Sequence, residues 1–155
     1  QTIGMLNAGA DMVWGCAGGS GNGVFEAISE VRAAGNTNVW ALGVDSDQYT
    51  ALSAQPTLAN TILTSGMKNC DIGILNAITM IIDGTAPYGT QEMKGYASGA
   101  VGLAENDYYT ANMTADEVAL VKTFTDKVLN GETVVVDELA TPGVFDTLYA
   151  QYGVK

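Results

Sequence analysis

Hydrophobic and polar positions along the first third of the chain change from a strand-like to a helix-like pattern and back. Residues 2–9 resemble the end of a helix closed by a glycine, and Met12–Trp14 is a short apolar run. After a glycine-rich stretch, apolar residues recur at helical spacing over 24–31, and a β-rich run follows over 38–44. A strand, a loop, a helix and a second strand in this order predict a βαβ unit with parallel strands.

The rest of the chain continues this alternation less regularly. Its expected elements are a strand at 61–64, a helix from about Lys68 to Gly84, a weak strand within 96–104, a helix at 114–131, a strand at 134–136 and a helix starting at Thr141-Pro142. The pattern predicts an α/β fold with a parallel sheet.

Composition and charge narrow the class of protein. The chain has 155 residues, of which 47% are hydrophobic and 15% are charged, as in one folded domain. The formal net charge of −11 argues against nucleic acid as a partner, because binding phosphates needs Lys and Arg. No apolar run reaches the roughly 18 residues of a membrane span. No signal peptide is recognised, and Gln1 indicates a mature product or a fragment.

The types of residue present exclude several kinds of site. The chain has no histidine, which excludes Ser-His-Asp and Cys-His catalysis and zinc sites built on imidazole. Cys16 and Cys70 lie far apart in the sequence and form no C-x-x-C motif, so we expect two small buried residues rather than a disulfide framework. We expect no catalytic residue, no metal and no cofactor.

The glycine-rich loop does not match the standard phosphate motifs. Gly18 and Gly23 have the spacing of a Walker A loop, but Val24 stands where the lysine should be. Gly19 and Gly21 begin a dinucleotide-binding pattern, and Val24 again replaces its last glycine. The nucleophile elbow also lacks its final glycine. Two interpretations remain: a tightly packed strand-to-helix turn, or a loop whose backbone amides approach a ligand.

Trp14, Asp45 and Lys68 lie at or just after the expected carboxyl ends of three strands. In open parallel sheets ligands bind outside these ends, so the three residues are candidates for one site. Each also has a purely structural alternative. Trp14 can belong to the core, Asp45 and Asp47 can cap turns, and Lys68 can be a solvated residue at a helix start.

Three blocks of sequence in the same order resemble a known family. They are "GADMVWGCAGGSGNGVFEA", "ALGVDSDQ" and "ILTSGMKNCDIGILNAI". Together they are similar to the basic membrane protein family, the bacterial substrate-binding lipoproteins of ABC transporters that are related to purine-nucleoside receptors. The resemblance covers roughly residues 4 to 105, and the order of helices extends it to about Gly131.

The resemblance implies a type I periplasmic-binding-protein fold, with two α/β lobes and the ligand between them. Residues 1–155 would be its C-terminal part, with most of the N-terminal lobe lacking. About 1–64 would belong to the second lobe, and later segments would cross back toward the first. The missing lobe would be a separate chain or copy, a disordered part, or lost.

The resemblance also implies roles for individual residues. Trp14 would stack on the base, Asp45 would bind the ribose hydroxyls, and Lys68 would reach the same sugar. Gly19 and Gly21 would line the floor of the cleft through their backbone. The chemistry suits a ribose, because a carboxylate accepts from vicinal hydroxyls and an ammonium donates to their oxygens. An indole offers a base a stacking face.

The expected function is therefore that of a solute-binding component of an ABC importer, with a permease as partner and a purine nucleoside or similar ribosylated solute as ligand. It would be extracytoplasmic, either a membrane-anchored lipoprotein or periplasmic, and not an enzyme. The alternatives are a sensory ligand-binding domain or a nucleotide-dependent α/β enzyme. This sequence departs from the family in Cys16, in a longer segment after "DSDQ" and in the missing base-reading lobe, so base specificity stays open.

Overall fold

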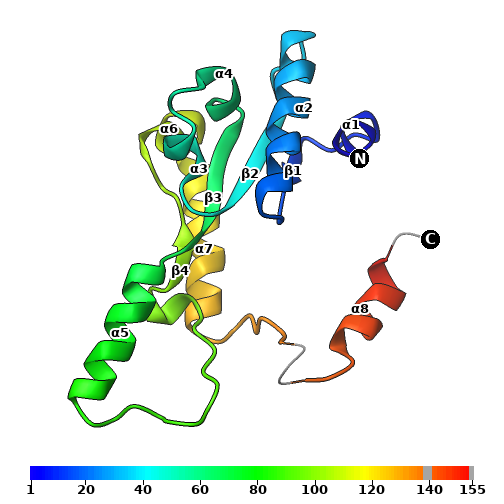
Figure 1. Cartoon of the computed structure of the whole chain (residues 1–155). Coiled ribbons are helices and arrows are strands. Elements are labelled where there is room, and N and C mark those ends of the chain that lie inside the picture. Colours follow the sequence, from blue (N-terminus) through cyan, green and yellow to red (C-terminus); the bar gives the residue numbers. More distant parts are fainter. Residues whose placement is uncertain (138–140, 154–155) are drawn as a thin grey trace. The chain divides into compact units, whose positions relative to one another are not determined.

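The computed structural model describes residues 1–137 and 141–153, which form two compact units, Gln1–Ala115 and Asp116–Lys155. The first unit is an α/β structure built on one sheet, and the second holds helices (Figure 1). Among the residues described, no helix is both long and apolar enough to cross a membrane.

The sheet of the first unit has four strands in the order β1-β2-β3-β4. They are β1 (Met12–Trp14), β2 (Trp40–Asp45), β3 (Ile62–Lys68) and β4 (Val101–Leu103). The first three are parallel, as the βαβ pattern predicts. β4 is antiparallel to β3, because the chain returns to the edge where β3 ends and pairs Val101 with Lys68. The sheet is therefore mixed rather than wholly parallel.

The helices of the first unit differ greatly in length. They are α1 (Thr2–Asn7), α2 (Asn22–Ala33), α3 (Gln48–Ala51), α4 (Pro56–Ala59), α5 (Cys70–Ile82) and α6 (Asp107–Asn112), with 3-10 turns at Gly19–Gly21 and Tyr96–Ser98. The sequence predicts α1, α2 and α5 but not α3, α4 or α6. Asp47 caps α3 by accepting a hydrogen bond from the Thr50 amide, in agreement with the expectation that it caps a turn.

The core lies between α2 and the first strands. The helical spacing over 24–31 places Phe25 and Ile28 on one face, where they are 1% and 0% exposed. They pack against Val13, Ala41 and Ile62 of the strands. This core fixes the positions of β1, β2 and β3, and hence of the residues at their carboxyl ends.

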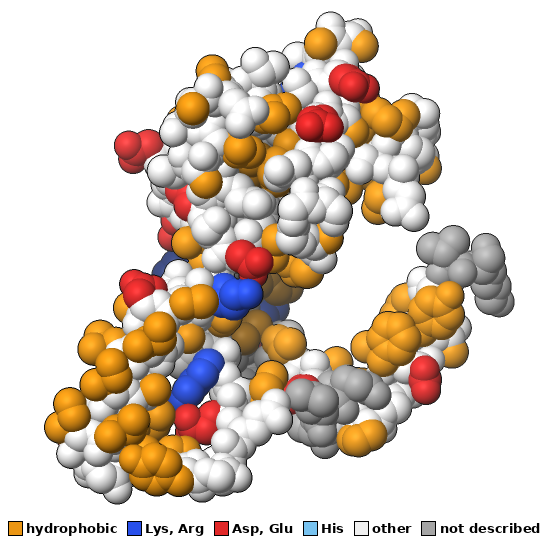
Figure 2. Space-filling model, viewed as in Figure 1, with side chains coloured by type: hydrophobic (Ala, Val, Ile, Leu, Met, Phe, Trp, Pro, Cys, Tyr) orange, Lys and Arg blue, Asp and Glu red, His pale blue; other side chains and the backbone are white. Residues whose placement is uncertain are grey.

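α5 carries the predicted apolar stripe, but this stripe is not buried. None of its thirteen residues, all of them described by the structure, is buried. Its exposed apolar side chains are Ile74, Leu75, Ile78, Ile81 and Ile82. Figure 2 shows hydrophobic side chains gathered over this helix. The periodic pattern predicted the helix correctly but not whether its face has a partner.

Three expectations about local structure are wrong. Lys68 ends β3 rather than starting the next helix, because β4 pairs with this extension of β3. Residues 134–136, all described, form no strand; their valines are exposed and no ladder pairs them. In the second unit, α7 (Ala115–Leu129) lies where expected, but α8 (Val144–Tyr152) begins after Gly143, whose φ of 89° breaks the helical geometry.

Candidate functional site

Two charged side chains meet at the carboxyl edge of the sheet. Asp45 ends β2, Lys68 ends β3, and the Lys68 Nζ lies 2.8 Å from the Asp45 Oδ1. Their side chains are 52% and 62% exposed, so the pair is open to solvent and to a ligand. The hydrogen bond that the Lys68 ammonium donates to Asp45, and then the negative charge of that carboxylate, raise the pKa of Lys68. The site thus holds a carboxylate acceptor and a charged donor side by side.

The backbone at Asp45 is unusual. Its φ is 71°, in the left-handed region, and among the described residues it is the one non-glycine residue with a positive φ. Aspartate tolerates this region better than most residues, but the conformation still costs free energy. Such strained positions cluster at functional sites, which makes Asp45 notable independently of any resemblance.

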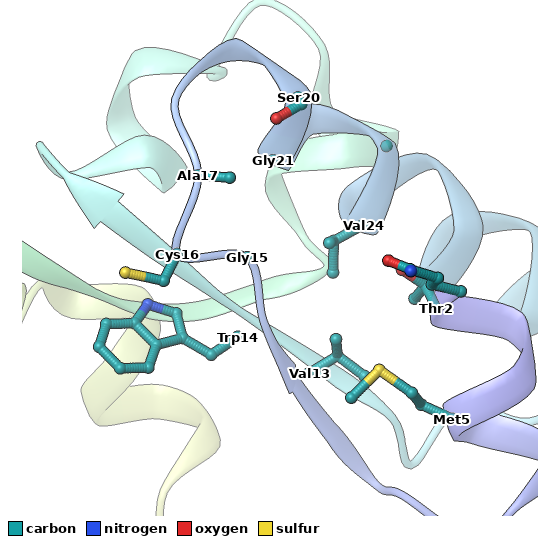
Figure 3. Close-up of a pocket in the computed structure, with 12 residues that line it drawn as sticks. Thr2, Met5, Val13, Trp14, Gly15, Cys16, Ala17, Ser20, Gly21 and Val24 are labelled. Atoms are coloured by element: carbon teal, nitrogen blue, oxygen red, sulfur yellow. The ribbon is translucent and has the colours of Figure 1, made fainter. Parts of the chain in front are cut away.

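Trp14 ends β1, and its side chain leaves the opposite face of the strand from Val13, as Figure 3 shows. It is 56% exposed, so its alternative assignment to the core is wrong. Its indole Nε1 donates to the carbonyl of Gly43 at 3.2 Å. Its Cζ2 lies 3.8 Å from where a Cβ on Gly66 would stand. The indole is therefore fixed over β2 and β3 and keeps much of its surface free.

The glycine-rich loop is tightest where Gly15 passes Gly21. A Cβ on Gly15 would lie 3.1 Å from a methyl group of Val24 and 3.4 Å from the Gly21 Cα. The amide of Gly21 donates to the carbonyl of Gly18 at 2.9 Å, so it is already engaged within the loop. Gly19 is exposed and opens the 3-10 turn. Sequence reasoning missed Gly15, because its role depends on a contact that no motif describes.

A pocket of about 460 Å³ lies beside this loop (Figure 3). Its lining residues come from the N-terminus and α1, from β1, from the glycine-rich loop and from the start of α2, and they include Met5, Val13 and Val24. Trp14 and Gly21 also line it, whereas Asp45, Lys68 and Gly19 do not. The pocket is lined by no charged side chain, so we base the candidate site on the ion pair and the exposed face of the indole.

Both cysteines contradict the expectation that they are buried. Cys16 and Cys70 are free and exposed. Cys16 lies in the loop next to the Trp14 indole (Figure 3), and Cys70 is the first residue of α5. The general tendency of cysteine to be buried fails here, because one residue lies in an open loop and the other on an uncovered helix. Among the residues described, no group of three His, Cys, Asp or Glu could hold a metal ion.

Comparison with known proteins decides the family. The model of the Bmp family, described as "ABC transporter substrate-binding protein PnrA-like", matches residues 3–136. The chain belongs to this family. The match covers the whole first unit except its first two residues and extends through α7.

Two curated relatives are similar to most of this chain. The chain is 34% identical over 140 residues to a "CD4+ T-cell-stimulating antigen" of Listeria monocytogenes, covering 86% of the chain and 38% of that protein. It is 30% identical over 126 residues to the "ABC transporter nucleoside-binding protein BmpA" of Lactococcus lactis, covering 77% and 35%. The chain thus spans little more than a third of these relatives.

The fold is similar to that of an ABC transporter solute-binding protein from Aeropyrum pernix. The TM-score is 0.66 at 22% identity, and the similarity covers 96% of this chain and 47% of that one. This supports the α/β architecture expected from the sequence. At this level of identity the likeness concerns the fold alone.

Proposed function

We propose that the chain is the part of an ABC-importer solute-binding protein that holds the sugar of a purine nucleoside or a similar ribosylated solute. The observation that carries this proposal is the Asp45–Lys68 pair at the sheet edge, with the exposed Trp14 indole held over the neighbouring strands. The name of the Lactococcus relative, a nucleoside-binding protein, supports the ligand class.

The charges of the pair favour a neutral sugar over a phosphate. The Lys68 ammonium is already paired with the Asp45 carboxylate, so an added phosphate would face that carboxylate with little net compensation. Vicinal hydroxyls can instead donate to Asp45 and accept from Lys68 without breaking the pair. Charge-assisted hydrogen bonds of this kind are the stronger ones.

Trp14 would supply the flat apolar surface. Its Nε1–H is engaged with Gly43, so the ring needs little further ordering when a base stacks on it. Stacking on an aromatic side chain is worth about 1–3 kcal/mol per base in nucleic-acid complexes. Gly19 and Gly21 would contribute as parts of the loop beside the indole rather than through side chains.

The exposed face of α5 supports a first lobe, largely outside this chain, as the other wall of the cleft. Monomeric soluble proteins rarely leave so contiguous an apolar surface open. The Listeria relative has ample further length to supply the cover. In this proposal about 1–64 forms the second lobe, and the segments from α5 onward cross toward the first. The complete protein would act outside the cytoplasm, as a lipoprotein or in the periplasm, would deliver its ligand to a permease, and would not be an enzyme.

The test is calorimetry on the full-length protein that carries this chain. We expect adenosine, guanosine or inosine to bind at micromolar concentration or below. Adenine alone should bind more weakly, because it offers Asp45 no hydroxyls. Asp45→Asn keeps a side chain that tolerates positive φ but removes the charge, and it should weaken binding roughly tenfold or more, the effect of losing charged hydrogen bonds.

Glu92→Gln is the matched control. Glu92 also forms an exposed ion pair, at 2.7 Å with Lys94, but it lies in the segment after α5. Its loss should leave nucleoside affinity unchanged. If neither nucleosides nor their sugars bind the wild-type protein, the proposed ligand class is wrong, whereas the family and the fold stand.

A further inference from the structure

The carboxyl end of β2 closes in a three-residue turn centred on Asp45. The amide of Ser46 donates to the carbonyl of Val44 at 2.9 Å, and the φ of Asp45 between them is 71°. A hydrogen bond from residue i+2 to residue i around a positive φ is typical of the rare γ-turn that strains an L-residue. Such a turn persists only where its surroundings impose it.

The Gln48 side chain forms a hydrogen bond with the backbone of this turn. Its Oε1 accepts a hydrogen bond from the Val44 amide at 3.0 Å, immediately before Asp45. The backbone amide of Gln48 donates to the Oγ of Ser65 at 3.2 Å, and Ser65 is completely buried in β3. Gln48 therefore ties the last residues of β2 to the interior of the strand that ends in Lys68.

Gly43 makes room for this arrangement. A Cβ at that position would lie 2.6 Å from the Gln48 Oε1 and would collide with the Ser65 Oγ as well. The φ of Gly43 is not positive, so the glycine is needed for space and not for backbone conformation. Gly43, the buried Ser65 hydroxyl and the half-buried Gln48 side chain thus fit together directly behind the turn.

The other end of this connection is also held. Asp47 accepts hydrogen bonds from the Thr50 amide and hydroxyl at 3.2 and 2.7 Å, and these bonds hold α3 in place. Gln48 is the first residue of this helix. The side chain of Asn106, the N-cap of α6, donates to both carboxylate oxygens of Asp47. Gln48 consequently extends from a helix start that is bonded from two directions, which limits its freedom to release the Val44 amide.

We propose that Gln48 is a positioning residue: by holding the Val44 amide, it imposes the γ-turn at Asp45 and directs that carboxylate toward Lys68 and the sugar. Gln48 acts through the backbone and has no contact of its own with the ligand. The part of the inference that concerns affinity rests on the proposed function. The part that concerns the geometry of the ion pair does not.

The experiment compares two substitutions in the full-length protein. Gln48→Met keeps the length of the side chain and removes the acceptor, whereas Gln48→Glu keeps an acceptor oxygen. Thr50→Val is the control, because it removes only the Thr50 hydroxyl bond to Asp47 from the same short helix and keeps the bonds from the Thr50 amide and Asn106 that hold Asp47. The readouts are thermal stability, calorimetric affinity for adenosine, and the pH titration of the Lys68 side chain, labelled with ¹³C at Cε and assigned with Lys68→Arg.

We expect Gln48→Met to weaken adenosine binding roughly tenfold, about the effect of one hydrogen bond, while its melting temperature falls no more than that of Thr50→Val. The titration midpoint of Lys68 should fall toward the ordinary lysine value, because the carboxylate no longer holds its position. Gln48→Glu should keep the raised midpoint, and Thr50→Val should change neither the midpoint nor the affinity.

An unchanged Lys68 midpoint in Gln48→Met would overturn the inference whatever the ligand. If no variant and no wild-type protein binds adenosine, but the midpoint falls in Gln48→Met alone, the positioning role stands and the proposed ligand is wrong. If Gln48→Met does not fold, Ser65→Ala provides the second variant, because it removes the hydroxyl that binds the backbone amide of Gln48. The same fall in the midpoint supports the inference there, and its absence contradicts it.

Discussion

α2 and α5 are two helices of similar length with apolar residues at helical spacing, yet they behave differently. α2 buries Phe25 and Ile28 against β1 and β2. α5 leaves Ile78 and Ile82 49% and 78% exposed. The sequence of α5 is the more hydrophobic of the two, so hydrophobicity does not decide which helix finds a partner within this chain.

The contrast teaches that a periodic pattern predicts a helix and a face but not the surface that will cover it. α2 connects two adjacent parallel strands, and such a crossover packs back onto the sheet. α5 follows β3 and leads into a long segment that returns only at β4. We therefore propose that the rest of the first lobe, which lies largely outside this chain, covers α5.

Phe25→Ala should produce the largest effect on the stability of this chain. Removing a fully buried phenylalanine costs about 3–5 kcal/mol of unfolding free energy, through lost burial and the cavity left behind. Urea denaturation of the 155-residue chain measures it. Leu75→Ala on α5, where the side chain is 58% exposed, should change the free energy by no more than about 0.5 kcal/mol. Equal losses at both positions would mean that α5 is buried and would remove the contrast.

The elements with long periodic patterns could be predicted from the sequence, and those held by single side chains could not. α3 and α4 have four residues each and depend on Asp47 at a cap and Pro56 at the first position. Too few residues are present for a period to appear. The direction of β4 depends on where the chain returns, which no local pattern records. Residues 134–136 have strand-like composition, but a strand also needs a partner.

The candidate site shows the same division. The topology predicts that the ends of three parallel strands converge, and the structure brings Asp45 and Lys68 into contact there. The γ-turn and the Gln48–Ser65 bond could not be predicted, because they depend on the register of β2 against β3. That these residues hold a ligand remains a prediction.

Ile78→Ala in the full-length protein should have an intermediate effect on stability, and it tests whether α5 is covered there. If the rest of the first lobe covers α5, the substitution should cost about 2 kcal/mol or more there, as for a buried isoleucine. In the 155-residue chain it should cost far less, because Ile78 is 49% exposed. Hydrogen exchange of the α5 amides provides the second measurement, since packing raises protection against local opening. Equal cost and equal protection in the two proteins would argue against the first lobe as the cover of α5.

The third prediction concerns α3 and has the smallest expected effect on stability, because hydrogen bonds rather than an apolar face hold this helix in place. Burial alone would raise the pKa of Asp47, but the hydrogen bonds from Thr50 and Asn106 outweigh it and lower that pKa. A carboxylate with a lowered pKa in the folded state stabilises the fold above its unfolded pKa of about 3.9, and the contribution is lost as the pH falls through the folded value. Asp47→Ala should cost about 1 kcal/mol at pH 7, the usual effect of losing an N-cap.

Thermal melts of the wild type and Asp47→Ala between pH 7 and pH 3 test this prediction. The difference in melting temperature should be constant down to about pH 4 and then shrink. Protonation of Asp47 removes its stabilising contribution from the wild type, and the variant already lacks that contribution. Glu92→Ala, which breaks an ion pair outside α3, is the control and should cost less at pH 7. A difference that grows as the pH falls would mean that Asp47 prefers its protonated form in the folded chain. The short helix would then have to be held by the packing of Tyr49 on Tyr108, whose rings stack with centroids 4.3 Å apart.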